Sequence, residues 1–394
     1  MKVILSVDPV KYPLTGIGRY TYELASRLQT RDALELLLLS NDRFVSELPS
    51  HAAAAAANAT LHRPTLPVMK SWLYQRLRKS YIAVEAAKAI KDAISRHALN
   101  KHKDAVFHGP NFYLTRFDGP SVATFHDISV FTFAQYHPPE RVRFMQRQMK
   151  LAMERASMLI TVSASARAEI ASYFAYPLDK IRAIPLACSA DFHPRSELEA
   201  SPVLERHGLK YGGYTLFTGT VEPRKNIDGL LDAYSALPQA IRQRWPLVIA
   251  GFHGWQSEKL HARIKAAADA GWVHYLGYVT NEELPYLYAG ARLFVFPSHY
   301  EGFGLPVLES MASGVPVVCS NVSSLPEVVG EAALTCDHDD VATLRQLIAR
   351  GLEDEGWRAD AIIKGLRRAA GFSWDRCADQ TMQVYRELAA GNRA

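Results

Sequence analysis

Two glutamates in the run EGFGLPVLE (301–309) carry the clearest chemical signal in this chain of 394 residues. Pro306 suits the first turn of a helix, and Gly302 and Gly304 open the loop before it. Glu301 is then expected in the loop and Glu309 one turn into the helix, both facing one cleft. The free N–H groups at the helix start favour an anion beside these carboxylates. Glycosidases also use two carboxylates, but theirs flank one bond, so a polyhydroxyl nucleotide sugar is the more natural ligand here.

A second signal is the basic pair Arg224 and Lys225 in EPRKN (222–226), just past the strand-like run YTLFTGT (214–220). Open parallel sheets bind ligands at the carboxyl ends of their strands, which is where this pair falls. An arginine can bind two phosphate oxygens at once, and a lysine adds a point charge. A surface pair that binds nothing is the alternative, but the position favours a phosphate-binding role.

A glycine loop, TGIGRYTYEL (15–24), follows the first strand-like run. Gly16 and Gly18 let the backbone approach a ligand closely, and the helix that follows offers free N–H groups, which suits a pyrophosphate or a sugar. The loop lacks the GxGxxG spacing and a suitably placed acidic residue, which disfavours a dinucleotide cofactor. Taken alone, the loop is better explained as a tight strand-to-helix turn.

His126 and Asp127 end the run SVATFHD (121–127), and a doubly wound sheet would place them in the same crevice as the glycine loop. A structural role for this pair is equally open.

The acidic run DHDD (337–340) has a DxD spacing that holds a metal in another transferase architecture. Capping of the next helix by Asp339 or Asp340 is the simpler interpretation. The fourteen histidines are scattered without metal-ligand spacing, so no metal site is expected.

Short apolar runs rich in β-branched residues alternate with amphipathic stretches, which predicts an α/β fold with parallel sheets covered on both faces. The predicted strands are 2–8, 34–40, 105–110, 121–127, 158–163, 180–186, 214–220, 246–251, 273–278, 293–298, 315–320 and 332–337. Twelve strands make two sheets of ordinary size rather than one. The polar segment 187–211 marks the boundary between two predicted domains, 1–195 and 207–372. A last amphipathic stretch within 373–394 follows no strand.

Composition excludes several classes of protein. The net charge of +5 permits an anionic ligand or membrane surface but does not require nucleic acid as a partner. Four single cysteines without a CxxC exclude a disulfide scaffold or a zinc finger. The apolar run at the N-terminus is too short for a signal peptide, and no window approaches a membrane-spanning helix. We therefore expect a cytoplasmic protein that is able to touch the inner face of a membrane.

Residues 61–103 are locally basic, with ten Lys and Arg against Glu85 and Asp92, which gives a local net charge of +8. Trp72 and Tyr74 lie among these charges. A basic amphipathic helix with aromatic residues can bind an anionic bilayer. A helix that covers the sheet and turns a solvated basic face outward is the alternative, and the pattern does not separate the two.

The glycine loop, the His126–Asp127 pair, the basic pair and the two glutamates follow one another along the chain. In that order they resemble the motifs of the retaining glycosyltransferases of family 4. Members have the GT-B architecture, in which two Rossmann-like, doubly wound domains face each other across a cleft. The two glutamates of 301–309 are the most specific match, and EPRKN, TGIGRY and FHD match the family's basic pair, glycine loop and active-site histidine region. The resemblance covers essentially the whole chain, and 373–394 resembles a final helix that crosses back to the N-terminal, acceptor-side domain. Thr220 departs from the family, because many members carry an arginine in this turn.

The resemblance implies a metal-independent transfer of a hexose from a nucleotide-sugar donor, with no other cofactor and with retention of configuration. The catalytic residues that it implies are His126, Asp127, Arg224, Lys225 and Glu301. The donor-binding residues that it implies are Gly16, Gly18, Arg224, Lys225, Glu301, Gly302, Phe303, Gly304, Leu305 and Glu309. Among these, Lys225 and Arg224 would hold the diphosphate, Glu309 the ribose, and Glu301 the transferred sugar.

The run HDISVFTFAQYHPPERVRF (126–144) resembles bacterial mannosyl- and rhamnosyltransferases of surface polysaccharide synthesis. That resemblance implies a GDP-linked hexose as donor and an O-antigen or related lipid-linked glycan as acceptor. A nucleotide-sugar-binding protein without transferase activity is one alternative, and another GT-B enzyme, such as an epimerase or a phosphorylase, is a second. The presence of Glu301, Lys225 and Glu309 together argues against a protein that has lost its activity.

Overall fold

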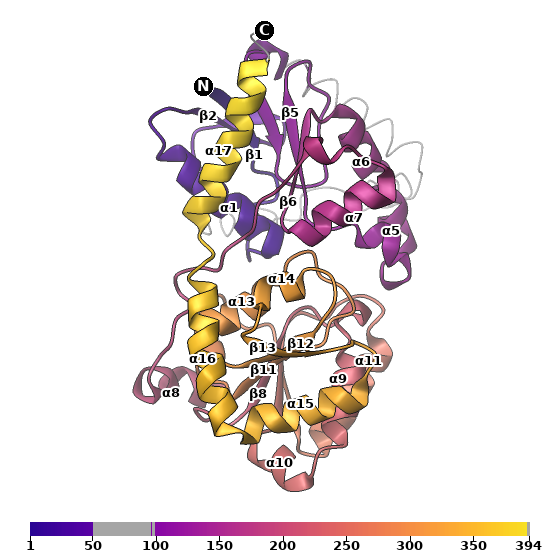
Figure 1. The fold of residues 1–394 in the computed structure, drawn as a ribbon, viewed down its shortest axis with the longest axis vertical. Coiled ribbons are helices and arrows are strands. Elements are labelled where there is room, and N and C mark those ends of the chain that lie inside the picture. The colour runs from indigo at the N-terminus through magenta and orange to yellow at the C-terminus, as the bar shows by residue number, and fades with distance from the viewer. Residues whose placement is uncertain (50–95, 97–98, 392–394) are drawn as a thin grey trace, which may run out of the picture.

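The computed structural model describes residues 1–49, 96 and 99–391, which form two α/β domains placed end to end (Figure 1). The N-terminal domain contains β1 (Lys2–Ser6), α1 (Gly16–Gln29), β2 (Glu35–Ser40), β3 (Arg43–Val45), η1 (Asn100–His102), β4 (Val106–Gly109), β5 (Ser121–Phe125), α5 (Ser129–Thr132), η2 (Ala134–Tyr136), α6 (Pro139–Arg155), β6 (Met158–Thr161), α7 (Ala164–Phe174), η3 (Leu178–Lys180) and β7 (Ile181–Ala183).

The C-terminal domain has its own set of alternating strands and helices. It contains α8 (Glu197–Arg206), β8 (Thr215–Thr218), η4 (Pro223–Lys225), α9 (Ile227–Ser235), α10 (Gln239–Arg244), β9 (Leu247–Ala250), α11 (Glu258–Asp269), β10 (Val273–Gly277), α12 (Leu284–Ala289), β11 (Leu293–Phe296), α13 (Leu305–Ala312), β12 (Val317–Ser320), α14 (Leu325–Val329), β13 (Ala333–Cys336), α15 (Val341–Glu353) and α16 (Glu355–Ala369), and the chain ends with α17 (Trp374–Gly391).

Both sheets are doubly wound. The first has the strand order β3-β2-β1-β4-β5-β6-β7, and the second has the order β10-β9-β8-β11-β12-β13. All described pairings are parallel except β2 with β3. The order reverses direction between β1 and β4 and again between β8 and β11, and ligands of such sheets bind outside the carboxyl ends of the strands at these points. The fold therefore confirms the predicted pair of Rossmann-like domains.

All twelve predicted strands are present, and each is shorter than predicted. The structure adds β3, a three-residue antiparallel strand at the edge of the first sheet. It also places a helix, α8, inside the polar segment 187–211 that was predicted to mark the domain boundary. A capping box begins this helix: the Ser196 side chain accepts from the Glu199 N–H, and the Glu199 carboxylate accepts from the Ser196 N–H.

The final helix, α17, leaves the C-terminal domain and runs along the N-terminal domain beside α1 (Figure 1). Arg31, just after the end of α1, pairs with Asp379 of α17 at 2.9 Å. The Tyr385 hydroxyl of α17 lies 2.6 Å from Nδ1 of His108, which is fully buried on β4. The crossing helix thus packs into the core of the N-terminal domain.

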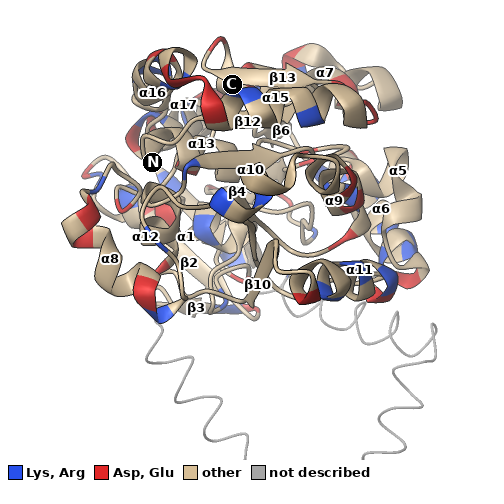
Figure 2. Ribbon diagram, turned by 90° about the horizontal axis from the view of Figure 1, so that it is seen from below, with Lys and Arg blue, Asp and Glu red and all other residues tan. Residues whose placement is uncertain are grey.

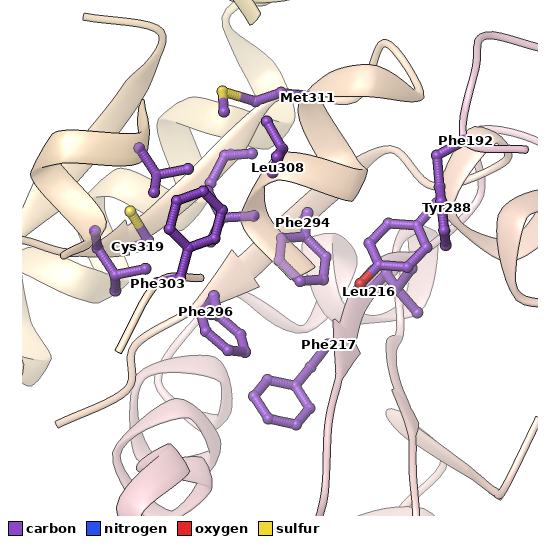
Figure 3. Close-up of a cluster of buried hydrophobic side chains, with 14 of the residues drawn as sticks. Phe192, Leu216, Phe217, Tyr288, Phe294, Phe296, Phe303, Leu308, Met311 and Cys319 are labelled. Carbon is purple, nitrogen blue, oxygen red and sulfur yellow. The ribbon is translucent and has the colours of Figure 1, made fainter. Parts of the chain in front are cut away.

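Large aromatic side chains fill the core of the C-terminal domain beneath the carboxyl ends of β8 and β11 (Figure 3). Phe217, Phe294 and Phe296 have no exposed surface, and the Phe296 ring stacks on both of the others at 5.8 Å between centroids. Burying an aromatic side chain contributes on the order of 2–3 kcal/mol. The loops that follow β8 and β11 therefore rest on tightly packed aromatic side chains.

The basic segment 61–103 lies mostly outside the described residues. Within the described part, Arg96 pairs with Asp118 at 2.9 Å. Elsewhere the surface charges are mixed: Figure 2 shows acidic and basic residues interspersed along α8 and α11. Lys265 and Asp269 of α11, for example, pair at 2.7 Å. In the part of the chain that is described, no helix combines the length and the apolar character needed to cross a bilayer.

Candidate functional site

The loop after β11 and the short helix η4 after β8 bring three charged side chains together at the point where the second sheet reverses direction. Lys225 Nζ lies 2.6 Å from Glu301 Oε1, and Arg224 Nη1 lies 3.2 Å from Glu301 Oε2. Lys225 and Glu301 are each 8% exposed. These residues are 76 positions apart in sequence, so the strand order alone brings them into contact.

The electrostatics of this cluster keep Glu301 ionised. Burial alone would raise the pKa of the Glu301 carboxyl, but the charges of Lys225 and Arg224 outweigh it and hold that pKa below its usual value. Burial lowers the pKa of Lys225. The negative charge of Glu301 raises that pKa but offsets the effect of burial only in part. The Lys225 ammonium also lies 4.9 Å from the centroid of the Phe296 ring, a cation–π contact with the packed aromatic side chains.

Arg224 is held in place by its own domain. Its Nη1 donates to the Tyr300 carbonyl at 2.6 Å, and its Nη2 donates to Glu222 Oε1 at 2.7 Å. Arg224 Nε is buried and has no hydrogen-bond partner among the described residues. An anion that entered here would meet one N–H of this guanidinium still free to donate.

Asn226 ties the basic pair to two neighbouring loops. It has a left-handed backbone (φ 53°) and caps α9, accepting from the Gly229 N–H at 3.2 Å. Its Nδ2 donates to the carbonyls of Pro297 at 3.1 Å and His338 at 2.7 Å. Sequence reasoning did not identify Asn226, although an asparagine directly before a helix is a known capping signal.

Glu309 lies on α13 and is partly buried. Gly304 caps this helix with φ 111° and Pro306 lies in its first turn, as the sequence predicted. Burial raises the pKa of Glu309 to about 7, against the opposing pull of the Tyr288 hydroxyl and of Arg19 from the N-terminal domain. This carboxyl therefore changes protonation near neutral pH.

The N-terminal domain contributes His126 and Asp127, directly after β5. His126 Nε2 donates to the Pro110 carbonyl at 3.0 Å, and burial lowers its pKa so that the ring is neutral. Asp127 Oδ1 accepts from the Ser129 N–H at 2.9 Å. Burial lowers the pKa of Arg224, but the charges of Glu301, Glu222 and, to a smaller extent, Asp127 outweigh it and raise that pKa. The charge of Asp127 therefore acts on the basic pair of the other domain.

The two domains touch at Gly302. A Cβ atom added there would lie 2.0 Å from the His126 carbonyl oxygen, and the Gly302 carbonyl accepts from Ser163 Oγ at 2.8 Å. Nearby, the first N–H groups of α7 donate to the Glu327 carboxylate at 2.9 and 3.1 Å. The catalytic residues suggested by the sequence thus lie on two facing surfaces that meet through the loop of 301–304.

Residues 207–368 match the family model described as "Glycosyl transferases group 1", and residues 14–192 match "Glycosyltransferase Family 4". Over 389 residues the chain is 46% identical to the O-antigen chain mannosyltransferase B of Escherichia coli, covering 98% of this chain and all of that protein. The chain belongs to glycosyltransferase family 4. The resemblance drawn from its motifs is therefore confirmed.

Solved structures show that this family 4 glycosyltransferase has the GT-B fold. The sucrose-phosphate synthase of Thermosynechococcus elongatus superposes with a TM-score of 0.71 at 22% identity, over 99% of this chain and all of the other. Anabaena Alr3699/HepE in complex with UDP-glucose gives a TM-score of 0.66 at 18% identity, over 98% of this chain and all of the other. Both superpositions extend over nearly the whole length of this chain and therefore include both of its domains.

The two glycines of the N-terminal loop have different surroundings in this glycosyltransferase. Gly16 begins α1, and a Cβ atom there would meet no atom within 4 Å. Gly18, two residues later in α1, is buried, and a Cβ atom there would lie 2.9 Å from the Pro9 carbonyl oxygen. Close packing against Pro9 is therefore enough to require glycine at 18, while Gly16 leaves open space at the helix start.

A buried hydrogen-bonded chain supports His126 from below. Tyr385 contacts His108, His108 Nε2 lies 2.8 Å from Thr124 Oγ1, and Thr124 Oγ1 lies 3.1 Å from the Tyr20 hydroxyl. The Tyr20 ring meets His126 edge-on at 5.1 Å between centroids. These contacts join α17, β4, β5 and α1. Local sequence patterns could not predict that these elements meet, because they lie far apart along the chain.

Proposed function

We propose that this protein is a retaining hexosyltransferase that moves mannose from GDP-mannose to a growing surface glycan or lipid-linked saccharide. The observation that carries the proposal is the buried cluster of Lys225, Arg224 and Glu301 at the switch point of the second sheet. The full-length similarity to a protein named a mannosyltransferase supports mannose as the sugar. Rhamnose remains the second candidate sugar from the resemblance of 126–144.

In this proposal each charged group acts on one part of the donor. Lys225 and Arg224 hold the diphosphate, which gains negative charge as the glycosidic bond breaks. Glu301 accepts hydrogen bonds from the transferred sugar, and Glu309 accepts them from the ribose. The backbone of Gly302–Gly304, with Phe303 and Leu305 beside it, adds N–H groups at the start of α13, where the helix dipole favours an anion.

The N-terminal domain closes the site in the same proposal. His126 and Asp127 lie beside the reactive face of the sugar, and the N–H groups near Gly16 approach the phosphate from the opposite side. The contact of Gly302 with the His126 carbonyl brings the two surfaces together. Closure excludes the water that would otherwise hydrolyse the donor.

A donor panel tests this function directly. The purified enzyme is incubated with GDP-mannose, GDP-rhamnose, UDP-glucose and other nucleotide sugars, with a mannose-terminated acceptor, and the product is analysed by NMR. We expect GDP-mannose to be used and the product to keep the α configuration of the donor. An inverted product, a different preferred donor, or no transfer from any donor would contradict the corresponding part of the proposal.

We expect transfer to persist in excess EDTA. The charge that develops on the diphosphate is met by Lys225, Arg224 and the start of α13, so no metal is needed on the donor. Initial rates with and without EDTA, measured with the same acceptor, check this prediction. Complete loss of transfer that magnesium or manganese restores would contradict it and would assign a donor-bound metal to the DHDD run.

We expect the KM for the donor to depend on pH near neutrality through Glu309. Its pKa is raised to about 7, so the carboxyl gains a proton as the pH falls and loses an acceptor for the ribose hydroxyls. Between pH 8 and pH 6 the donor KM should rise roughly threefold to tenfold. Glu309→Gln should raise the KM more than it lowers kcat, because ribose contacts are similar in the ground and transition states, and should remove the pH dependence.

The same shift predicts the opposite trend for stability. A carboxyl with a raised pKa binds its proton more tightly in the folded state than in the unfolded state. Glu309 therefore contributes stability at low pH that is lost as the pH rises from 4.5 to about 7.

The prediction for the donor KM has its own contradicting outcome. If Glu309→Gln retains the full pH dependence of the donor KM, another group is responsible for that dependence.

We also propose that the basic segment 61–103 binds an anionic membrane surface, where a lipid-linked acceptor would lie. Each basic residue near such a surface adds up to roughly 1 kcal/mol, screened by salt. We expect sedimentation with anionic but not neutral vesicles, lost at high salt. Replacing Arg76, Arg78 and Lys79 with glutamate should abolish it, whereas reversing the exposed Lys259 and Lys265 of α11 should not. Wild-type protein that ignores anionic vesicles at low salt would contradict this role.

A further inference from the structure

Two histidines and an aspartate from separate loops converge beside the basic pair. His299 follows β11, and His338 and Asp339 follow β13; their ligating atoms all lie within 4.8 Å of one another. His338 Nε2 is 3.4 Å from Asp339 Oδ2, and His299 Nδ1 is 3.9 Å from Asp339 Oδ1. The two rings meet edge-on, with 4.9 Å between centroids. Because His299 lies far from His338 and Asp339 in the sequence, no local motif spacing indicates this group.

The backbone, rather than the side chains, fixes this arrangement. The His299 N–H donates to the Arg224 carbonyl at 2.9 Å, and the His338 carbonyl accepts from Asn226 Nδ2 at 2.7 Å. The Asp339 N–H donates to Asp337 Oδ1 at 2.9 Å. The imidazole nitrogens and the Asp339 carboxylate are therefore held close together without being used to hold the loops.

The side chains have unused bonding capacity. Nδ1 of His299 and Nδ1 of His338 are both buried, and neither has a hydrogen-bond partner among the described residues. His338 Nδ1 lies 3.5 Å from Asp337 Oδ1, on the far side of the ring from the nitrogen that approaches Asp339. Buried polar atoms in native structures nearly always have a partner, so two such atoms in one cluster need an explanation. Asp340, and not Asp339, caps α15 by accepting from the Thr343 N–H at 2.9 Å. The Asp339 carboxylate is thus free to take another role.

We propose that His299, His338 and Asp339 bind one divalent transition-metal ion of the Zn²⁺ class. Two imidazole nitrogens and one carboxylate oxygen, with a fourth position left open, are a common ligand set for zinc. Magnesium and calcium prefer oxygen ligands and fit this set poorly. Ligand atoms around a tetrahedral zinc ion lie about 3.3 Å apart, which the His338 and Asp339 atoms already match and which the His299 side chain reaches with a small movement.

The position of the site indicates what the metal would do. It joins the loops after β11 and β13, one of which carries Glu301 two residues beyond His299. The Tyr136 ring of the N-terminal domain stacks on His299 at 5.4 Å between centroids. A bound metal would stiffen one wall of the cleft next to the donor site while leaving the diphosphate to Lys225 and Arg224. The proposal does not depend on the identity of the donor.

Metal binding can be measured without any donor. The full chain is purified without a histidine tag, stripped with EDTA, and titrated with Zn²⁺ by calorimetry; Co²⁺ absorption reports the ligand geometry. We expect one tight equivalent of Zn²⁺ per chain, a higher Tm with Zn²⁺ than after stripping, and Co²⁺ bands typical of four-coordinate nitrogen and oxygen ligands. Mg²⁺ at the same concentration should produce neither the heat nor the Tm shift.

Variants assign the bound metal to this cluster. Loss of an outer-shell partner alone costs 10–100-fold in metal affinity, so Asp339→Asn and His338→Ala should each weaken Zn²⁺ binding by about 100-fold or more. Asp339 is 76% exposed at its side chain, so its variant should fold normally and keep the Tm of the stripped wild type. His274→Ala, at an exposed position of β10, is the matched control and should bind like the wild type. Undetectable binding by the wild type, or unchanged binding by Asp339→Asn and His338→Ala, would overturn the proposal.

Discussion

Replacing Lys225 with alanine should reduce kcat for glycosyl transfer by roughly 10²-fold or more while the fold survives. Lys225 is buried on the Phe296 ring. In the proposed function its ammonium meets the charge that grows on the leaving diphosphate. A preorganised cation in a low-dielectric site stabilises a transition state by several kcal/mol, and nothing in the variant replaces it. The donor KM should change less, because this interaction strengthens as the bond breaks.

Two further variants separate the charge from the packing of Lys225. Lys225→Met keeps the aliphatic stem over Phe296 and should be as inactive as Lys225→Ala, if the charge is what matters. Lys265→Ala removes an exposed lysine of α11 that pairs with Asp269 and should leave kcat unchanged. Steady-state kinetics with melting curves decide the question. A Lys225→Met variant that keeps most of the wild-type kcat would show that Lys225 acts through packing and that its assignment to the diphosphate is wrong.

Replacing Gly302 with alanine should lower transfer by about 10²-fold with little loss of stability. The added methyl group would lie 2.0 Å from the His126 carbonyl oxygen, well inside van der Waals contact. That carbonyl belongs to the other domain, so the clash is relieved by holding the domains apart and not by disrupting either core. A misplacement of about 1 Å between reacting groups is enough to cost 10²-fold in rate.

Scattering and kinetics together test the Gly302 prediction. We expect Gly302→Ala to bind the donor with a KM within a few-fold of wild type but to remain more open than wild type in small-angle X-ray scattering with donor present. Gly391→Ala, in α17, adds the same methyl group where no atom lies within 4 Å, and it should behave as wild type. Near-normal turnover by Gly302→Ala would mean that catalysis does not need the domain contact that this structure shows.

Local sequence signals determined most of the architecture. Apolar runs with β-branched residues predicted twelve of the thirteen strands in the two described sheets, because a parallel strand covered on both faces must be apolar along its length. Gly304 and Pro306 predicted the start of α13 from the conformations those residues allow. The edge strand β3 was missed because three residues are too few to show a period. Helix α8 was missed although Ser196 and Glu199 have the spacing of a capping box.

The sequence predicted which residue types belong to the site but not which of them contact one another. The chemical character of Lys225, Glu301 and Glu309 could be read from their types and positions, together with the family they indicate. That Lys225 and Glu301 contact each other was decided by the order of β8 and β11 in the sheet, since no local pattern joins residues 76 positions apart. The same reason explains why the contact of Gly302 with His126 was missed: it requires two domains to meet. A sequence determines local conformation through each residue's own preferences, but only the packed structure decides which distant side chains share a site.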